Sequence, residues 1–274
     1  MITIFTAPKP FRGHIGIIQR NAIQSWIKLG QMCKIVLIGD DDGIAETAFE
    51  FNLTYIPDIK KNKFGTPLIN SIFSTAEKIS TSSMLCYINT DIILLKDFII
   101  AANRLNLRKF LMIGQRWDMN ISYALDFTSP NWEIDLKKNV SKFGILHSIY
   151  GIDYFLFSKG LWENIPPFAL GRTIWDNWLV CDARSKGAAV INATDVVIAV
   201  HQNHNYDGSK KEIFTGPEAI QNGKMAGIKG LSILDSNYIL TPDKLKHALN
   251  INYIKRLPGR WLRLHPKIGN LFLK

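Results

Sequence analysis

The first third of the chain alternates between strand-like and helix-like runs of apolar residues. Residues 2–6 form a short β-rich run that ends at a proline-containing loop, and residues 15–29 then repeat apolar side chains at helical spacing until Gly30. Residues 34–40 follow as an apolar strand that ends in acids. Strand, helix and strand in this order predict a right-handed parallel crossover.

The same alternation continues to the middle of the chain and becomes less regular beyond it. The most hydrophobic strand, over 83–88, runs directly into Asn89-Thr90-Asp91. Because no repeat or linker divides the chain, we expect one mixed α/β sheet and then a C-terminal helical extension. The other predicted elements are helices over 43–52 and 67–79, with Pro67 in a first-turn position, and strands over 53–56, 110–114, 154–157 and 190–200.

The composition is that of a globular protein. At 274 residues and 47% hydrophobic, the chain is long enough for one large domain, or one domain with a small appendage. Cys33, Cys86 and Cys181 lie far apart in apolar surroundings, so we expect reduced core residues rather than disulfides or a clustered zinc site. The N-terminus lacks a leader pattern and no run approaches about 20 apolar residues, which predicts a cytoplasmic protein.

The formal net charge of +10 is concentrated near the C-terminus. Aromatic and aliphatic residues interleave with the basic ones there, a pattern that fits peripheral contact with anionic lipid headgroups at the inner face of a membrane. A solvated helix packed on the domain fits the same pattern equally well. The basic residues of this tail are Lys244, Lys246, Lys255, Arg256, Arg260, Arg263, Lys267 and Lys274.

Asp91 is the first residue that indicates chemistry. A carboxylate at the end of an apolar strand is costly unless water, a partner or a metal satisfies it. Mg²⁺ and Mn²⁺ prefer oxygen ligands and are commonly held by one or two carboxylates together with substrate phosphates. The alternative is an aspartate that caps the next turn, and the local sequence favours neither.

The order of elements around Asp91 resembles that of GT-A fold nucleotide-diphospho-sugar glycosyltransferases. Those enzymes carry an Asp-x-Asp metal motif after a hydrophobic strand, and here Asn89-Thr90-Asp91 keeps only the last acid, which is usually the direct metal ligand. The resemblance implies a mainly parallel sheet flanked by helices over residues 1–205, with residues 206–274 as an extension beside the active site. It further implies a nucleotide-diphosphate sugar as donor, Mn²⁺ or Mg²⁺ as cofactor, and a glycan or lipid-linked acceptor.

The resemblance also assigns a nucleotide site. Thr6, Ala7 and Pro8 after the first strand would contact the base or ribose, and Asp40 after the second strand would contact the nucleobase. Asn89 and Thr90 belong to the same nucleotide site as part of the motif. Arg20 is a further candidate, for the diphosphate. As alternatives, Pro8 shapes a turn and Asp40 belongs to a solvated loop or caps the next helix.

Asp176 stands between two tryptophans, Trp175 and Trp178, where a helix is expected to begin. Aromatic faces stack on sugar rings, and the exclusion of water raises the pKa of a carboxylate toward the range of a general base. Inverting transferases of the GT-A fold resemble this arrangement, so Asp176 is the candidate base. Alternatively, Asp176 caps a helix whose tryptophans are core. The resemblance also makes Asp153, at the head of the strand over 154–157, a candidate sugar-binding acid. Arg116, Trp117 and Asp118 could line the sugar pocket or form a polar loop with no special purpose.

His201 and His204 follow directly after the apolar run that ends at Val200. Neutral imidazole ligates Mn²⁺, and many metal-dependent members of the fold supply a late histidine to the cation. A turn that forms hydrogen bonds with itself would explain the same two histidines. A dedicated zinc site is not expected, because Cys181 is not part of a ligand-like pair.

These candidates together predict a metal-dependent hexosyltransferase of polysaccharide biosynthesis that inverts the anomeric centre. Asp91 and His201 would hold a cation across the donor diphosphate, and Asp176 would deprotonate the acceptor hydroxyl. A sugar-nucleotide nucleotidyltransferase is a rival, but it needs a glycine-rich loop after the first strand, which residues 6–11 lack. A non-catalytic protein that binds nucleic acid or lipid surfaces is another rival. Of its ligands, nucleic acid is the less expected.

Overall fold

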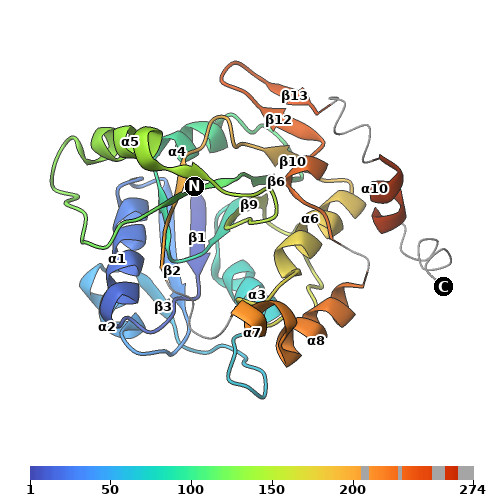
Figure 1. Cartoon of the computed structure of the whole chain (residues 1–274), viewed down its shortest axis with the longest axis horizontal. Coiled ribbons are helices and arrows are strands. Elements are labelled where there is room, and N and C mark those ends of the chain that lie inside the picture. The colour runs from blue at the N-terminus through green and yellow to red at the C-terminus, as the bar shows by residue number, and fades with distance from the viewer. Residues whose placement is uncertain (205–209, 228–229, 249–256, 265–274) are drawn as a thin grey trace.

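The computed structural model describes residues 1–204, 210–227, 230–248 and 257–264 (Figure 1). The strands are β1 (Ile2–Thr6), β2 (Cys33–Ile38), β3 (Thr54–Ile56), β4 (Met84–Ile88), β5 (Ile92–Leu94), β6 (Phe110–Ile113), β7 (Arg116–Met119), β8 (Ile145–Leu146), β9 (Tyr154–Ser158), β10 (Ala189–Asn192), β11 (Ala199–Gln202), β12 (Tyr238–Leu240) and β13 (Leu245–His247). The helices are α1 (Gly13–Ile27), α2 (Ile44–Glu50), α3 (Ile69–Ile79), α4 (Lys96–Asn103), α5 (Trp132–Phe143), α6 (Trp175–Ser185), α7 (Lys210–Thr215), α8 (Pro217–Ala226), the 3-10 helix η1 (Ile233–Asp235) and α10 (Leu257–Leu264).

Two sheets organise these elements. The larger has nine strands in the order β13-β12-β10-β6-β9-β4-β1-β2-β3, and most neighbours run parallel. β9 is the exception inside the sheet, because it runs antiparallel to both β4 and β6. The smaller sheet has the order β5-β11-β7-β8. The predicted α/β class and the mainly parallel sheet are confirmed, whereas the sequence suggested one sheet and the chain forms two.

Side chains alternate between the two faces of the large sheet, and each face buries its own core. The core on one face lies between the sheet and α3 and α6, while the core on the opposite face lies beneath α1, α2 and α4. Trp26 of α1 is fully buried in the second core and donates its Nε1–H to the carbonyl of Ile92 at 2.9 Å. This contact fixes α1 against the strand that immediately follows Asp91.

The apolar run over 190–200 forms two strands rather than the single predicted strand. Asn192 ends β10, because its Oδ1 accepts hydrogen bonds from the backbone N–H and the hydroxyl of Thr194 at 3.0 and 2.6 Å. The chain then enters the small sheet as β11. This turn carries His201 away from the large sheet and toward the end of β4. A smaller difference concerns α3, which begins at Ile69, so that Pro67 lies just before the helix.

The C-terminal part adds strands as well as helices. β12 pairs in parallel with β10, and β13 pairs antiparallel with β12, so the large sheet continues beyond the expected boundary at residue 205. These strands lie at the opposite end of the sheet from β3 (Figure 1). Much of the predicted basic tail, over 249–256 and 265–274, lies outside the described residues.

Two sequence expectations concern cysteines and membrane spans. Cys86 and Cys181 are buried and Cys33 is partly buried, as expected of core residues. Within the described ranges, no helix has the length and apolar character needed to cross a membrane.

Candidate functional site

A cleft of about 680 Å³ opens at the carboxyl ends of β1 and β4. Because β9 runs antiparallel to β4, the residue that precedes β9 lies at this same edge. The backbone N–H of Asn89 donates to the carbonyl of Asp153 at 2.9 Å and ties the two segments together. The carboxyl edge of such sheets is where ligands bind in open α/β folds. The cleft-lining residues predicted from the sequence are Ala7, Pro8, Asn89, Thr90, Asp91, Arg116, Asp153, Trp175, Asp176, His201 and His204.

Asp91, His201 and His204 form a compact cluster on one wall of the cleft. The antiparallel register of β5 and β11 sets Ile92 opposite His201, which brings the histidine beside Asp91. Asp91 Oδ2 lies 3.0 Å from His204 Nε2 and 3.6 Å from His201 Nε2, and one ligand atom from each residue falls within 4.8 Å of the others. Two imidazoles and a carboxylate are a donor set that suits Mn²⁺.

The electrostatics of this cluster favour an ionised carboxylate. Burial alone would raise the pKa of Asp91, but the hydrogen bonds and charges of His201 and His204 hold it well below its usual range. For His201, burial lowers the pKa, but the hydrogen bond and the negative charge of Asp91 raise it by more, so the pKa of His201 is raised overall. The second oxygen, Asp91 Oδ1, is buried and accepts no hydrogen bond within the described part of the chain. An orphaned carboxylate oxygen beside two imidazoles fits a divalent cation.

Behind the cluster, a second carboxylate on β7 supports His201. The parallel register of β7 and β11 pairs Asp118 with His201, and Asp118 Oδ1 lies 3.2 Å from His201 Nδ1. Asn203 Oδ1 also lies 3.3 Å from this nitrogen. Both neighbours are acceptors, so Nδ1 carries the proton and Nε2 is directed at Asp91. Such outer contacts orient the histidine ligands of metals in many proteins.

Asn89 and Asp153 are joined by a polar network across the cleft floor. Asn89 Nδ2 donates to Asp153 Oδ1 at 2.7 Å, and Tyr87 donates its hydroxyl to Asn89 Oδ1 at 3.1 Å. Arg116 donates to the other oxygen, Asp153 Oδ2, at 2.8 Å and to Asp118 Oδ1 at 2.9 Å. This network explains the departure from Asp-x-Asp, because position 89 must supply a donor to a carboxylate that an aspartate would repel.

Asp176 lines the cleft from another element, in the first turn of α6. The residue before the helix, Ile174, has φ = 80°, which is unusual for a β-branched side chain and sets the direction in which α6 starts. Burial raises the pKa of Asp176 to about 7, and the nearby charge of Asp153 adds to this shift. Backbone N–H groups of Ile152 and Asn177 hydrogen-bond the carboxylate and act in the opposite direction. A carboxylate near neutrality in its pKa has the property required of a general base.

The two tryptophans beside Asp176 differ in position. Trp175 lines the cleft and packs on Tyr87 and Phe155, with both ring-centroid distances at 5.5 Å. Trp178 packs edge-on against Phe168. Both rings are buried in the same core, with exposed fractions of 5% and 4%, as the core alternative of the sequence analysis described, and only Trp175 also contributes to the wall of the cleft.

Besides Trp178 and Asp118, four predicted site residues do not line the cleft. Thr6 is buried and hydrogen-bonds Thr90 at 2.7 Å, so it joins β1 to the motif from behind. Trp117 packs against the small-sheet core. Asp40 pairs with Lys61, whose hydrogen bond lowers the pKa of this exposed carboxylate, while its neighbour Asp41 reaches the cleft instead. Arg20 pairs with Glu50 on α2.

Sequence reasoning missed His147 and underrated Asp118. His147 lies in the loop after the two-residue strand β8, and its Nδ1 is 2.6 Å from Asp118 Oδ2. It lines the cleft with Ser148 and Tyr150. Neither residue belongs to a linear motif, because only the pairing of β7 with β8 brings them together.

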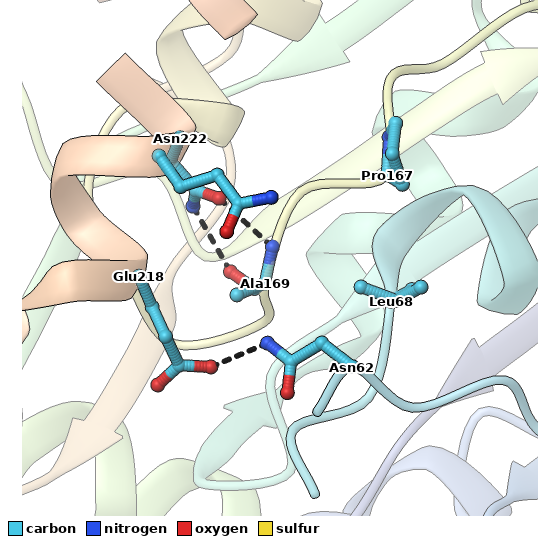
Figure 2. A pocket seen from close by; sticks show the side chains of 7 residues that line it. Asn62, Leu68, Pro167, Ala169, Glu218 and Asn222 are labelled. Carbon is cyan, nitrogen blue, oxygen red and sulfur yellow. Dashed lines mark hydrogen bonds between the residues drawn. The ribbon is translucent and has the colours of Figure 1, made fainter. Parts of the chain in front are cut away.

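A second, smaller hollow lies beneath α8, away from the metal cluster (Figure 2). Asn62 donates to Glu218 Oε1 at 2.6 Å, and Asn222 exchanges two hydrogen bonds with the backbone of Ala169. Glu218 also receives the guanidinium of Arg172, a residue of the main cleft, at 2.6 and 2.9 Å. These polar atoms form hydrogen bonds with one another, so the hollow is a structural contact that holds α8 against the rim of the cleft.

Comparison with known proteins places the fold. No protein-family model matches the sequence, and a search of curated proteins finds no relative. Among solved structures, S. aureus TarS 1–349 in complex with UDP-GlcNAc superposes with a TM-score of 0.51 at 10% identity over 75% of this chain and 59% of that one. The present chain thus spans about three fifths of the TarS fragment.

Two further structures give the same result. Glucosyl-3-phosphoglycerate synthase of M. tuberculosis superposes with a TM-score of 0.50 at 12% identity, over 82% of this chain and 80% of that one. Mannosyltransferase PcManGT of Pyrobaculum calidifontis, in complex with GDP-Man and Mn²⁺, gives 0.51 at 11% identity over 84% and 65%. At such identities the likeness establishes the fold, and the GT-A fold expected from the sequence is confirmed.

Proposed function

We propose that the protein transfers a sugar from a nucleotide-diphosphate donor to a hydroxyl of a glycan or lipid-linked acceptor. The observation that carries this proposal is the cluster of Asp91, His201 and His204, with a buried unpaired carboxylate oxygen, at the carboxyl edge of a GT-A sheet. The fold likeness to structures bound to UDP-GlcNAc and to GDP-Man with Mn²⁺ supports the same class of donor.

The three cluster residues would hold Mn²⁺ or Mg²⁺. Once bound, the cation supplies positive charge that neutralises the departing nucleoside diphosphate. The protein's own part is to keep Asp91 ionised and His201 directed at it, and Asp118 and Asn203 contribute by occupying the other ring nitrogen. Asn89, Thr90, Ala7 and Pro8 line the same cleft, and Ala7 and Pro8 would contact the base or ribose.

Asp176 is proposed as the base that accepts the proton of the acceptor hydroxyl. Its raised pKa suits proton abstraction near neutral pH, and it lines the same cleft as Asp91 from a different element, α6. Direct attack predicts inversion at the anomeric carbon. The anomeric configuration of the product, compared with that of the donor, tests this step, and retention would remove Asp176 from the role.

Thermal-shift measurements with nucleoside diphosphates test the function as a whole. We expect UDP or GDP to raise the melting temperature in the presence of Mn²⁺ and to do so much less in EDTA, because a ligand that binds only the native state stabilises it. Asp91→Ala should abolish the shift that depends on Mn²⁺. The matched control is Asp135→Ala, which removes an exposed aspartate of α5. If no nucleotide shifts the wild-type protein, the proposed function is wrong.

Contact with an anionic membrane through the C-terminal tail is a separate proposal. In the described part of this tail, Trp261 is 48% exposed, while Arg260 is buried and pairs with Asp235 at 3.2 Å. Co-sedimentation with vesicles of phosphatidylglycerol and of phosphatidylcholine tests it. Binding only to the anionic vesicles, and its loss at high salt and in Lys255→Glu/Arg256→Glu, is the expected result.

A further inference from the structure

One carboxylate, Asp118, faces two histidines of the cleft. Its Oδ1 accepts from Arg116 Nε at 2.9 Å and lies 3.2 Å from His201 Nδ1, while its Oδ2 lies 2.6 Å from His147 Nδ1. His201 belongs to the proposed metal cluster. His147 belongs to no cluster described so far, although it lines the cleft.

The acceptors around Asp118 place a proton on one ring nitrogen of His147. An ionised carboxylate only accepts hydrogen bonds, so Nδ1 of His147 must be the donor. The backbone holds the ring in place as well, because the N–H of His147 donates to the carbonyl of Arg116 at 2.9 Å. Gly151 also leaves room for the ring, since a Cβ at that position would lie 2.5 Å from His147 Cδ2. In the neutral ring, the remaining nitrogen, Nε2, then carries a lone pair.

We propose that His147 binds substrate through Nε2, which accepts a hydrogen bond from a sugar hydroxyl, and that Asp118 is the positioning residue that fixes this tautomer. The inference rests on the proposed function for the identity of the ligand as a sugar. Within the described chain, no side chain hydrogen-bonds His147 Nε2, and the cleft beside it is lined by Ser148, Tyr150 and Asp153.

The chemistry of Nε2 selects the class of ligand. A lone pair needs a donor, and an ionised phosphate offers none, whereas every sugar carries several hydroxyl donors. Asp118 and Asp153 share one cation, Arg116, so the pair of carboxylates keeps a net negative charge that also disfavours an anionic group in this part of the cleft. Two sources of a sugar hydroxyl remain, the donor sugar and the acceptor, and binding experiments separate them.

The tautomer is tested directly by ¹⁵N NMR of the histidine rings in the metal-free protein. In the wild type we expect His147 as the neutral Nδ1–H form, with Nε2 unprotonated. In Asp118→Asn the amide oxygen must remain toward Arg116, so the NH₂ faces His147 and the ring should switch to the Nε2–H form. His201 keeps Asn203 as an acceptor and should not switch.

Asp135→Asn is the matched control and should leave both rings unchanged. A doubly protonated or Nε2–H ring at His147 in the wild type overturns the inference, and so does a ring in Asp118→Asn that stays in the Nδ1–H form.

Binding of nucleotides and nucleotide sugars tests the contact itself. His147→Phe fills the space of the ring but offers no acceptor, and His247→Phe on β13 is its control. If the donor sugar is the ligand, His147→Phe raises the Kd of UDP-GlcNAc or GDP-Man about tenfold and leaves the Kd of UDP or GDP within twofold, all with Mn²⁺. If the acceptor is the ligand, all four values hold and the KM for a sugar acceptor rises instead.

Unchanged constants in every arm overturn the role of His147. A wild-type protein that binds none of the four nucleotides overturns the proposed function and with it the sugar contact. The NMR result still decides the positioning role of Asp118 in that case.

Discussion

Asp91 and Asp176 are carboxylates of the same cleft in opposite environments. Asp91 lies against His201 and His204, and its pKa is held well below the usual range. Asp176 has no cationic partner within the described residues, and burial raises its pKa to about 7. Burial disfavours the charged form of both acids, so the difference comes from the partners.

This difference suits the two carboxylates to complementary tasks. A carboxylate that stays ionised and keeps one oxygen unpaired can hold a cation, whereas one that titrates near neutrality can take up a proton. Enzymes that need both tasks separate the pKa values of two acids in this way. The comparison therefore predicts that each acid fails differently when it is changed.

Removal of Asp91 should have the largest effect. Asp91→Ala deletes the only carboxylate of the described metal cluster, so we expect Mn²⁺ binding to be lost and sugar transfer to fall by at least about 10⁴-fold. Calorimetric titration with Mn²⁺ and a nucleotide measures the first effect, and release of nucleoside diphosphate measures the second. Asp135→Ala serves as the control. If Asp91→Ala retained its affinity for Mn²⁺, the metal would have to bind elsewhere than at Asp91, His201 and His204.

Asp176→Asn should separate the roles of the two acids most clearly. The amide keeps the size of the side chain but accepts no proton, so we expect kcat to fall about 10³-fold while the Kd of the nucleotide with Mn²⁺ stays within twofold. Steady-state kinetics and calorimetry on the same preparation give both numbers. A parallel loss of nucleotide affinity would contradict the separation.

The pH dependence of stability tests the raised pKa of Asp176. The folded carboxyl keeps its proton up to about pH 7, whereas the unfolded chain releases it near pH 4, so its contribution to stability falls as the pH rises from 4 to 7. Asp176→Asn removes this penalty. We expect the variant to gain about 4 kcal/mol over the wild type at pH 8, and little at pH 4, in urea unfolding with EDTA. A difference that does not change with pH would show that the folded pKa is normal.

Restoring the missing motif acid should harm the protein. Asn89→Asp replaces a donor by a second carboxylate 2.7 Å from Asp153, so we expect a loss of about 1–2 kcal/mol at pH 7.5 in urea unfolding. The exchange variant Asn89→Asp/Asp153→Asn, which has one acid and one amide again, should recover most of it. If Asn89→Asp is as stable as the wild type and binds Mn²⁺ more tightly, the number of carboxylates, and not the hydrogen-bond partners of each one, determines metal binding at this site.

Much of this cleft follows from local sequence. The motif at the end of β4, the head of β9 and the start of α6 are ends of elements, and an apolar run predicts where an element ends. Asp91, Asp153 and Asp176 could be proposed for that reason. Because the chain folds as a GT-A sheet, these ends converge on one edge.

The contacts of Asp118 could not be found in this way. Asp118 meets His147 through the pairing of β7 with β8, an exposed strand of two residues that leaves no alternating pattern in the sequence. The register of β7 and β11 depends in turn on the turn at Asn192, inside a run that looks like one strand. Long-range pairing of short strands is specified by the assembled sheet, not by local pattern.

Changing Arg20 should have the smallest effect, because an ion pair on the surface does not by itself indicate a functional residue. It has partners, as Asp91 does, since it pairs with Glu50 and lies 5.1 Å from the ring of Phe51, but both ionic side chains are more than a third exposed and neither lines the cleft. Exposed pairs contribute about 0.5 kcal/mol or less, because water screens the charges. Arg20→Gln should therefore leave stability nearly unchanged and the Kd of UDP or GDP with Mn²⁺ within twofold, and Glu50→Gln should behave alike. A tenfold loss of nucleotide affinity in Arg20→Gln alone would mean that this side chain leaves Glu50 to reach the diphosphate. The nucleotide site would then include a residue of α1.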